Sequence, residues 1–261
     1  MIVAGCDVGS LTGKAVILRD GSIVSKSIVP VTVRPETTAM NAINEALRNT
    51  DLKLADIEYM VGTGYGRRKI PFANLNISEI TCHARGAFHQ VPSIRTILDI
   101  GGQDCKVISL DAEGNVADFV MNDKCAAGTG KFLEGVARAL GLDLNELGPM
   151  SLTAKSPSVI SSQCSVFAES EVITLLADGE DIANIVAGIH KAIAGRLISL
   201  VKKVGLRKDF TLTGGVAKNA GVVKFLEDGL GKITKLPEDP QLTGAIGAAI
   251  IASEKLVKSH A

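Results

Sequence analysis

Two short segments place an aspartate at the end of an apolar run and just before a glycine. They are Asp7-Val8-Gly9 and Asp99-Ile100-Gly101, and a lysine follows each aspartate at the same offset, as Lys14 and Lys106. Such a strand end offers a carboxylate and free backbone amides, where α/β proteins usually bind ligands. One such segment usually marks only a turn, whereas the repetition with a matching lysine favours nucleotide binding.

The two segments together could clamp a polyphosphate between them. Asp7 and Asp99 would hold a hydrated Mg²⁺, which takes only one or two carboxylates. The phosphates would be wrapped by amides, a hydroxyl and an ammonium group from one stretch, namely Ser10, Leu11, Thr12, Gly13 and Lys14.

A second set of residues would approach the nucleotide from the other side. It comprises Gly101, Gly102, Gln103 and Asp104, and either Gln103 or Asp104 would orient the attacking water, since phosphoryl transfer depends mainly on positioning. Thr213-Gly214-Gly215 would let the backbone come close to a flat group such as adenine.

Two of the five cysteines precede expected helices. Cys125 opens the stretch CAAGTGK, which is not a phosphate loop because that motif requires Gly in place of Cys125 and a hydroxyl in place of Phe132. Cys164 precedes the next helix, and a helix N-terminus favours a thiolate. Two thiolates are too few for a [4Fe-4S] cluster, which takes four, but a two-fold dimer supplies four.

The alternative for both cysteines is the usual one, a small buried side chain. Cys6, Cys82 and Cys105 lie in apolar runs, and we expect them in the core. We expect His83 to be a hydrogen-bonded helix histidine rather than a metal ligand. No C-x-x-C pair occurs, which argues against a disulfide framework or a self-contained zinc site.

Composition limits the classes of partner. The 261 residues are 46% hydrophobic, and 28 basic side chains balance 28 acidic ones without a basic tail, so neither nucleic acid nor a membrane surface is an expected partner. We find no cleavage site and no apolar stretch long enough to span a bilayer, and expect a cytoplasmic protein.

The elements that must position these residues form two similar halves. Expected strands at 2–7, 14–19 and 22–29 recur 92 residues later, whereas the Thr-Gly pairs in the segments 59–66 and 210–217 are 150 residues apart. The second half therefore carries 150 − 92 = 58 extra residues, an insertion at about 122–181 that contains both Cys125 and Cys164. The pattern predicts an α/β protein of two duplicated lobes.

Helices are expected at 35–48, 128–140, 165–176, 182–204 and 243–257. We expect the last helix to fold back onto the first lobe, which would then comprise 1–91 and 243–261, with 92–242 as the second lobe. A chain that begins and ends in one lobe has a two-linker hinge, so closure over a nucleotide would be natural.

Six blocks of the sequence together resemble a known family, the BadF/BadG/BcrA/BcrD ATPases, and within it the ATP-dependent activators of (R)-2-hydroxyacyl-CoA dehydratases. The resemblance covers essentially the whole chain. The blocks are Asp7 to Ser10, Thr63 to Arg67, Asp99 to Asp104, Asn122 to Gly130, Val166 to Glu171 and Thr213 to Ala217.

The resemblance implies ribonuclease-H-like lobes of the actin/Hsp70/sugar-kinase type and a homodimer with one bridging [4Fe-4S] cluster, whose ligands fall on Cys125 and Cys164. The family's ATP/ADP segment falls on Ser10 to Lys14, with further contacts near Gly101 to Asp104 and at Gly214, Gly215, Val216 and Gln241. One departure is visible, because Leu11 and Gly13 stand where activators usually carry small hydroxyl or alanine residues.

The implied function is ATP-driven electron transfer. A reduced flavodoxin or ferredoxin would load the cluster, and ATP binding and hydrolysis would drive a low-potential electron into a partner iron–sulfur enzyme such as a 2-hydroxyacyl-CoA dehydratase. Relatives also serve benzoyl-CoA reductase and double-cubane cluster proteins. A small-molecule kinase and an Hsp70-like binding module of the same superfamily remain as alternatives.

Overall fold

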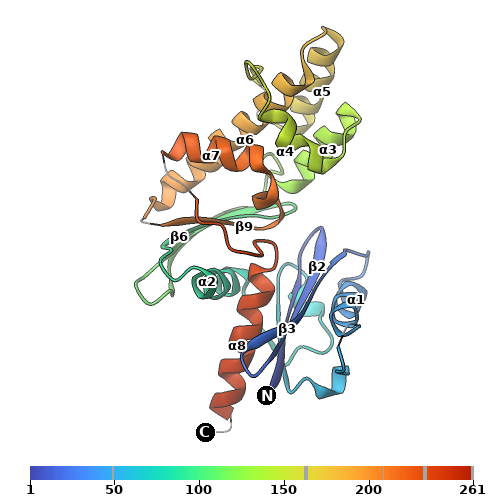
Figure 1. Cartoon of the computed structure of the whole chain (residues 1–261), viewed down its shortest axis with the longest axis vertical. Coiled ribbons are helices and arrows are strands. Elements are labelled where there is room, and N and C mark those ends of the chain that lie inside the picture. The colour runs from blue at the N-terminus through green and yellow to red at the C-terminus, as the bar shows by residue number, and fades with distance from the viewer. Residues whose placement is uncertain (49, 162–163, 208, 232–233, 260–261) are drawn as a thin grey trace.

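A computed structural model describes residues 1–48, 50–161, 164–207, 209–231 and 234–259 (Figure 1). Two β-sheets lie one above the other in this view, with both chain termini at the bottom. At the top lie the helices α3 (Gly130–Leu140), α4 (Leu144–Ser151) and α5 (Ser165–Ala177). The duplicated halves that the sequence predicts therefore occupy separate parts of the molecule.

The first sheet has the order β3-β2-β1-β4-β5. Its strands are β1 (Ile2–Val8), β2 (Thr12–Arg19), β3 (Ser22–Pro30), β4 (Tyr59–Thr63) and β5 (Leu75–Asn76). Alternate residues of β1 point to opposite faces: Val3 packs under α8 (Thr243–Ser259), whereas Ala4 and Cys6 pack under α1 (Pro35–Leu47). Because both faces are covered, β1 is apolar along nearly its whole length.

The second sheet repeats this arrangement with the order β8-β7-β6-β9. Its strands are β6 (Thr96–Ile100), β7 (Cys105–Leu110), β8 (Val116–Asn122) and β9 (Phe210–Thr213). In both sheets the first strand pairs antiparallel with the second and parallel with the glycine-ended strand. The short helical turns η1 (Leu54–Asp56), η2 (Arg67–Lys69) and η3 (Gly215–Lys218) complete the connections.

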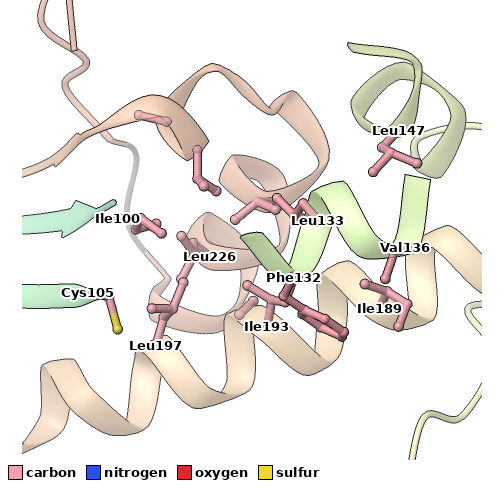
Figure 2. Close-up of a cluster of buried hydrophobic side chains, with 14 of the residues drawn as sticks. Ile100, Cys105, Phe132, Leu133, Val136, Leu147, Ile189, Ile193, Leu197 and Leu226 are labelled. Carbon is pink, nitrogen blue, oxygen red and sulfur yellow. The ribbon is translucent and has the colours of Figure 1, made fainter. Parts of the chain in front are cut away.

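The largest core lies in the second lobe around α6 (Ile182–Val204). Figure 2 shows Phe132 of α3 (Gly130–Leu140) beside Ile189 and Ile193 of α6, with Leu226 of α7 (Ala220–Leu230) nearby. By length and composition α6 could cross a membrane, which corrects our expectation that no stretch is long enough. It is 61% buried over the apolar window, as in the core helix of a soluble protein.

The insertion forms α3, α4 (Leu144–Ser151) and α5 (Ser165–Ala177). Helices α3 and α5 pack closely at Gly135, where an added methyl group would overlap the Glu169 carboxylate. The helices that follow Cys125 and Cys164, α3 and α5, therefore belong to one helical layer at the top of Figure 1.

Helices α2 (Glu79–Gln90) and α8 join the two lobes. An added methyl group would overlap the backbone of the facing helix at both Gly86 and Gly247, so only glycine allows this approach. Cys82 of α2 packs in a buried cluster with Val3 of the first sheet, whereas Ala84 packs in another cluster with Ile97 of the second sheet. Because α2 packs against both lobes, the lobe boundaries at 91 and 243 stay predictions. Residues 260 and 261, which we assigned to the first lobe, lie outside the described chain.

His190 of α6 is a fully buried histidine whose role is structural. Asn219 accepts a hydrogen bond from Val222 N through Oδ1, so its Nδ2 faces His190 Nε2 at 3.3 Å and donates to it. The other ring nitrogen, Nδ1, therefore carries the hydrogen and donates to Ser151 Oγ at 2.9 Å. Burial lowers the pKa of His190 from 6.5 to about 4, because a charged ring would lose water and face the Asn219 amide hydrogens.

This environment predicts a pH dependence of stability. The unfolded chain takes up a proton near pH 6.5 and the folded chain only near 4, so the free energy of unfolding should fall by about 3 kcal/mol as the pH drops through this window. His190→Gln should be less stable at neutral pH but should lack this loss, whereas the exposed-site control His89→Gln should keep it. Urea titrations at a series of pH values measure the slopes, and equal slopes for both variants would contradict the assignment.

Candidate functional site

The first aspartate–lysine pair lies at the end of β1. Asp7 and Lys14 are directly opposed across the β1–β2 hairpin, and Lys14 Nζ is 3.2 Å from Asp7 Oδ2. Both side chains are largely buried, with 7% of Asp7 and 12% of Lys14 exposed. The offset of seven residues that the sequence repeats is therefore that of two residues opposed across a hairpin whose last pair is Val8 and Gly13, with residues 9–12 between them.

The second pair repeats this geometry and is more deeply buried. Asp99 and Lys106 are opposed across β6 and β7, with Lys106 Nζ 3.1 Å from Asp99 Oδ2. Lys106 also contacts Asp104 Oδ2 at 2.7 Å and Glu79 Oε2 at 3.5 Å, so one ammonium group serves three carboxylates.

The pKa values follow from this arrangement. Burial alone would lower the pKa of Lys106, but Asp99, Glu79 and Asp104 together hold it well above its usual range. Burial would raise the pKa of Asp99, but His83, Lys106 and the Thr213 hydroxyl hold it well below its usual range. Burial raises the pKa of Glu79, against the opposing effect of Lys106. Asp99 is thus a fixed carboxylate and Lys106 a fixed ammonium at neutral pH.

A Thr-Gly pair closes each site from the neighbouring parallel strand. Thr63 lies beside Asp7 and Thr213 beside Asp99, and the glycine that follows each has a positive φ, +87° at Gly64 and +85° at Gly214. A methyl group on Gly64 would overlap Asp7 Oδ1, and one on Gly214 would lie 3.0 Å from Asp99 Oδ1. Glycine is therefore required at both positions, for its backbone conformation and for space.

His83 of α2 lies between the two sites. Its Nδ1 is 3.3 Å from Asp99 Oδ1 and 3.2 Å from Thr213 Oγ1, and Thr213 Oγ1 already donates to Asp99. Since both neighbours accept, Nδ1 carries the hydrogen. On the other side of the ring, His83 Nε2 lies close to Gly244, and so does Asp7 Oδ2. A methyl group added to Gly244 would be 3.0 Å from each of these two atoms.

The expectation of a hydrogen-bonded helix histidine is confirmed for His83. Its position between Asp99 and Asp7 was not foreseen, because nothing in the sequence near residue 83 indicates which strand ends α2 will face.

The two expected phosphate loops contact each other. A methyl group on Gly102 would lie 2.5 Å from Leu11 Cγ and 2.8 Å from Ser10 Oγ. In the second loop Asp104 is engaged by Lys106, whereas Gln103 is exposed and makes no side-chain hydrogen bond to the described residues. The structure therefore brings Ser10 to Lys14 together with Gly101 to Asp104.

The residues expected near the base lie beside an apolar pocket. The η3 turn carries Gly215 and Val216, and Gly214 N is bonded to Pro240 O, which brings Gln241 next to this turn. Lys218 Nζ donates to Gln241 Oε1 at 2.8 Å. The neighbouring pocket is about 660 Å³ in volume and includes Lys218, Leu236 and Pro240 in its lining. Lys218, the last residue of η3, was not predicted as a site residue.

The five cysteines divide into two kinds. Cys6, Cys82 and Cys105 are buried, as expected, while Cys125 and Cys164 are exposed. Burial raises the pKa of Cys82 to about 12 and that of Cys105 to about 11, and it also raises that of Cys6. The alternative that Cys125 and Cys164 are small buried side chains is therefore wrong.

Only one of the two exposed cysteines lies directly at the N-terminus of a helix. Cys164 is the N-cap residue of α5, whereas Cys125 lies in the loop before α3, whose N-cap is Thr129. The first two amides of α3 are not available to Cys125, because Gly130 N and Lys131 N donate hydrogen bonds to the carbonyls of Gly101 and Gly102. Within the described residues, no group of three or more His, Cys, Asp or Glu side chains could hold a metal ion.

Comparison with known proteins finds relatives that match the whole chain. The chain is 48% identical to the activator of lactoyl-CoA dehydratase of Anaerotignum propionicum over 259 residues, which cover 99% of this chain and 100% of the relative. The structure of the activator of 2-hydroxyisocaproyl-CoA dehydratase from Clostridium difficile with bound ADPNP is similar at a TM-score of 0.96 and 43% identity, covering 100% of this chain and 97% of that one.

A second solved structure, component A of (R)-2-hydroxyglutaryl-CoA dehydratase from Acidaminococcus fermentans, gives a TM-score of 0.94 at 44% identity, covering 98% of this chain and 99% of that one. The expected two-lobed α/β fold of the actin/sugar-kinase type is thereby confirmed. Residues 4–252 match one family over nearly the whole chain, so the protein belongs to the BadF/BadG/BcrA/BcrD ATPase family.

Proposed function

We propose that this protein is an ATPase that activates a 2-hydroxyacyl-CoA dehydratase by transferring an electron to it. The observation that carries the proposal is the direct contact between two loops from different lobes, each beside a buried aspartate–lysine pair. Similarity to dehydratase activators along the whole chain supports the choice of partner. Benzoyl-CoA reductase and double-cubane proteins remain alternative partners.

The charges of the site favour a nucleotide that arrives with its metal. Four carboxylates, Asp7, Asp99, Asp104 and Glu79, meet two ammonium groups, Lys14 and Lys106. A polyphosphate alone would add to this negative excess, whereas Mg²⁺ bound to the phosphates would offset it. Asp7 is the better candidate to face the hydrated metal, because Asp99 is already bonded to Thr213, His83 and Lys106.

The backbone amides of residues 10–13, with Lys14, would bind the phosphates. Gln103 would orient the attacking water, since its amide is exposed and Asp104 is held by Lys106. The base would lie against Gly214 and Gly215, near Lys218 and Gln241. These roles follow the general requirement of phosphoryl transfer for positioning and for charge stabilisation.

The two exposed thiols suit a cluster shared between two copies of the chain. A [4Fe-4S] cluster takes four thiolates and would supply one-electron chemistry; one chain offers two exposed thiols, so Cys125 and Cys164 from each of two chains would complete the set. The partners are then a second copy, the dehydratase, and a flavodoxin or ferredoxin donor, all in the cytoplasm.

Replacing Asp7 tests the nucleotide site. Asp7→Asn should lower Mg²⁺-dependent ATP hydrolysis by about 100-fold to 1,000-fold, because it removes a charge that acts at the metal and phosphates. Asp51→Asn, at a surface aspartate paired with Arg19, should hydrolyse ATP like the wild type. Phosphate release with and without EDTA measures the effect, and an Asp7→Asn rate above a tenth of the wild-type rate would reject this role.

Two variants test whether Gln103 or Asp104 orients the attacking water. Gln103→Ala should lower kcat for ATP hydrolysis by about 100-fold, the cost of a misplaced nucleophile, without changing the affinity for ADP. Asp104→Asn keeps the shape of its side chain and should lower kcat less. Steady-state kinetics and calorimetry give both quantities, and the opposite order of the two variants would assign the water to Asp104.

Removing one thiol tests the cluster site. After anaerobic reconstitution the wild type should hold about four iron atoms per two chains, and its mass should be twice the 27.2 kDa of one chain. Cys125→Ser and Cys164→Ser should lose the iron, whereas the buried-site control Cys82→Ala should retain it. Iron analysis and light scattering check this, and full iron content in either serine variant would refute the assignment.

A further inference from the structure

Leu11, together with Ser10, is a side chain through which the loop of the first lobe meets the second lobe. It lies at the tip of the β1–β2 hairpin, and its Cγ and Cδ1 are 2.5 and 2.8 Å from the position of a methyl group added to Gly102. The same Cδ1 lies 3.7 Å from the corresponding position at Gly130, the first residue of α3. Leu11 therefore reaches both the β6–β7 loop and the start of the helix behind it.

The β6–β7 loop is in turn bonded to α3. Gly130 N donates to Gly101 O at 3.0 Å, and Lys131 N donates to Gly102 O at 2.9 Å. A side chain usually accepts from these first amides of a helix, but the N-cap residue Thr129 makes no such bond and donates to Ala126 O instead. The carbonyls of Gly101 and Gly102 thus cap α3, so a displacement of this loop must move the helix or break both bonds.

Core packing does not explain why a leucine occupies position 11. Its side chain is only partly buried, and it belongs to none of the buried clusters formed by the described residues. Its carbonyl accepts a hydrogen bond from Val31 N at 3.1 Å, so the hairpin tip is tied to the chain that follows β3. A leucine that projects from the hairpin tip against a glycine is suited to pass on small movements of the hairpin, because closely packed groups deform little.

We propose that Leu11 is a positioning residue that transmits the nucleotide state of the first loop to α3 and to the segment that carries Cys125. This rests on the proposed function, in which residues 10–14 hold the phosphates. Loss of the terminal phosphate shifts the hairpin tip, Leu11 moves against Gly102, and the two capping hydrogen bonds carry the movement into α3. ATP and ADP can shift this equilibrium only by their different affinities for the two positions of the loop.

Hydrogen exchange of the full-length chain, without a cluster, tests the proposal. In the wild type, amides of residues 125–135 should exchange at different rates with ADP and with a non-hydrolysable ATP analogue. In Leu11→Ala this difference should shrink by about fivefold or more when each nucleotide is present at a concentration that calorimetry shows to saturate the variant. Leu11→Met, which keeps the bulk of the side chain, should restore the difference.

A second variant approaches the same contact from the other side. Gly102→Ala should change the exchange of residues 125–135 even without nucleotide, because its methyl group cannot coexist with Leu11 in the present position. An undiminished nucleotide-dependent difference in Leu11→Ala would overturn the proposal. So would a wild type that binds both nucleotides with equal exchange at α3, or a Leu11→Ala variant that loses nucleotide binding. If calorimetry detects no nucleotide binding by the wild type, the proposed ATPase function fails as well.

Discussion

A lysine buried among carboxylates determines how the second half of the site is built. Lys106 is 2% exposed, and leaving an ammonium group there without partners would cost several kcal/mol. Asp99 on β6, Asp104 in the following loop and Glu79 on α2 supply the partners, so this one side chain joins a strand, a loop and an inter-lobe helix. The loop that carries Gly101 and Gly102 is consequently held at its far end by Asp104 and along its carbonyls by α3.

The corresponding pair of the first lobe is held less tightly. Lys14 has one carboxylate partner, Asp7, and both side chains are more exposed than Lys106 and Asp99. Duplication has thus produced two loops of the same shape but different rigidity. Under the proposed function the site responds to ATP and ADP, which requires one part that yields and one that transmits. The hairpin tip at Leu11 and the loop at Gly102, which is bonded to α3, would provide this combination.

The strands, the duplication and most helices could be predicted because their signals are local. The helix 182–204 was placed at its observed bounds, since apolar spacing continues along all of it. Helix α4 was missed, because it is short and contains Gly148 and Pro149, and α7 was missed because η3 separates it from β9. The links from Glu79 and His83 to the second lobe could not be predicted, since they depend on how α2 packs between the lobes.

The two exposed thiols differ in the charge stabilisation that the fold offers them. The first amides of α3 are used by Gly101 and Gly102, so this helix end has little left to offer a negative charge at Cys125. Cys164 is itself the N-cap of α5, with no side-chain hydrogen bond to that helix end. A negative group held by both thiols would therefore be stabilised mainly from α5, by about 1 kcal/mol at a partly exposed site. The α3 side is instead bonded to the loop at Gly101 and Gly102, so under the proposed function one helix end would stabilise charge and the other would transmit movement.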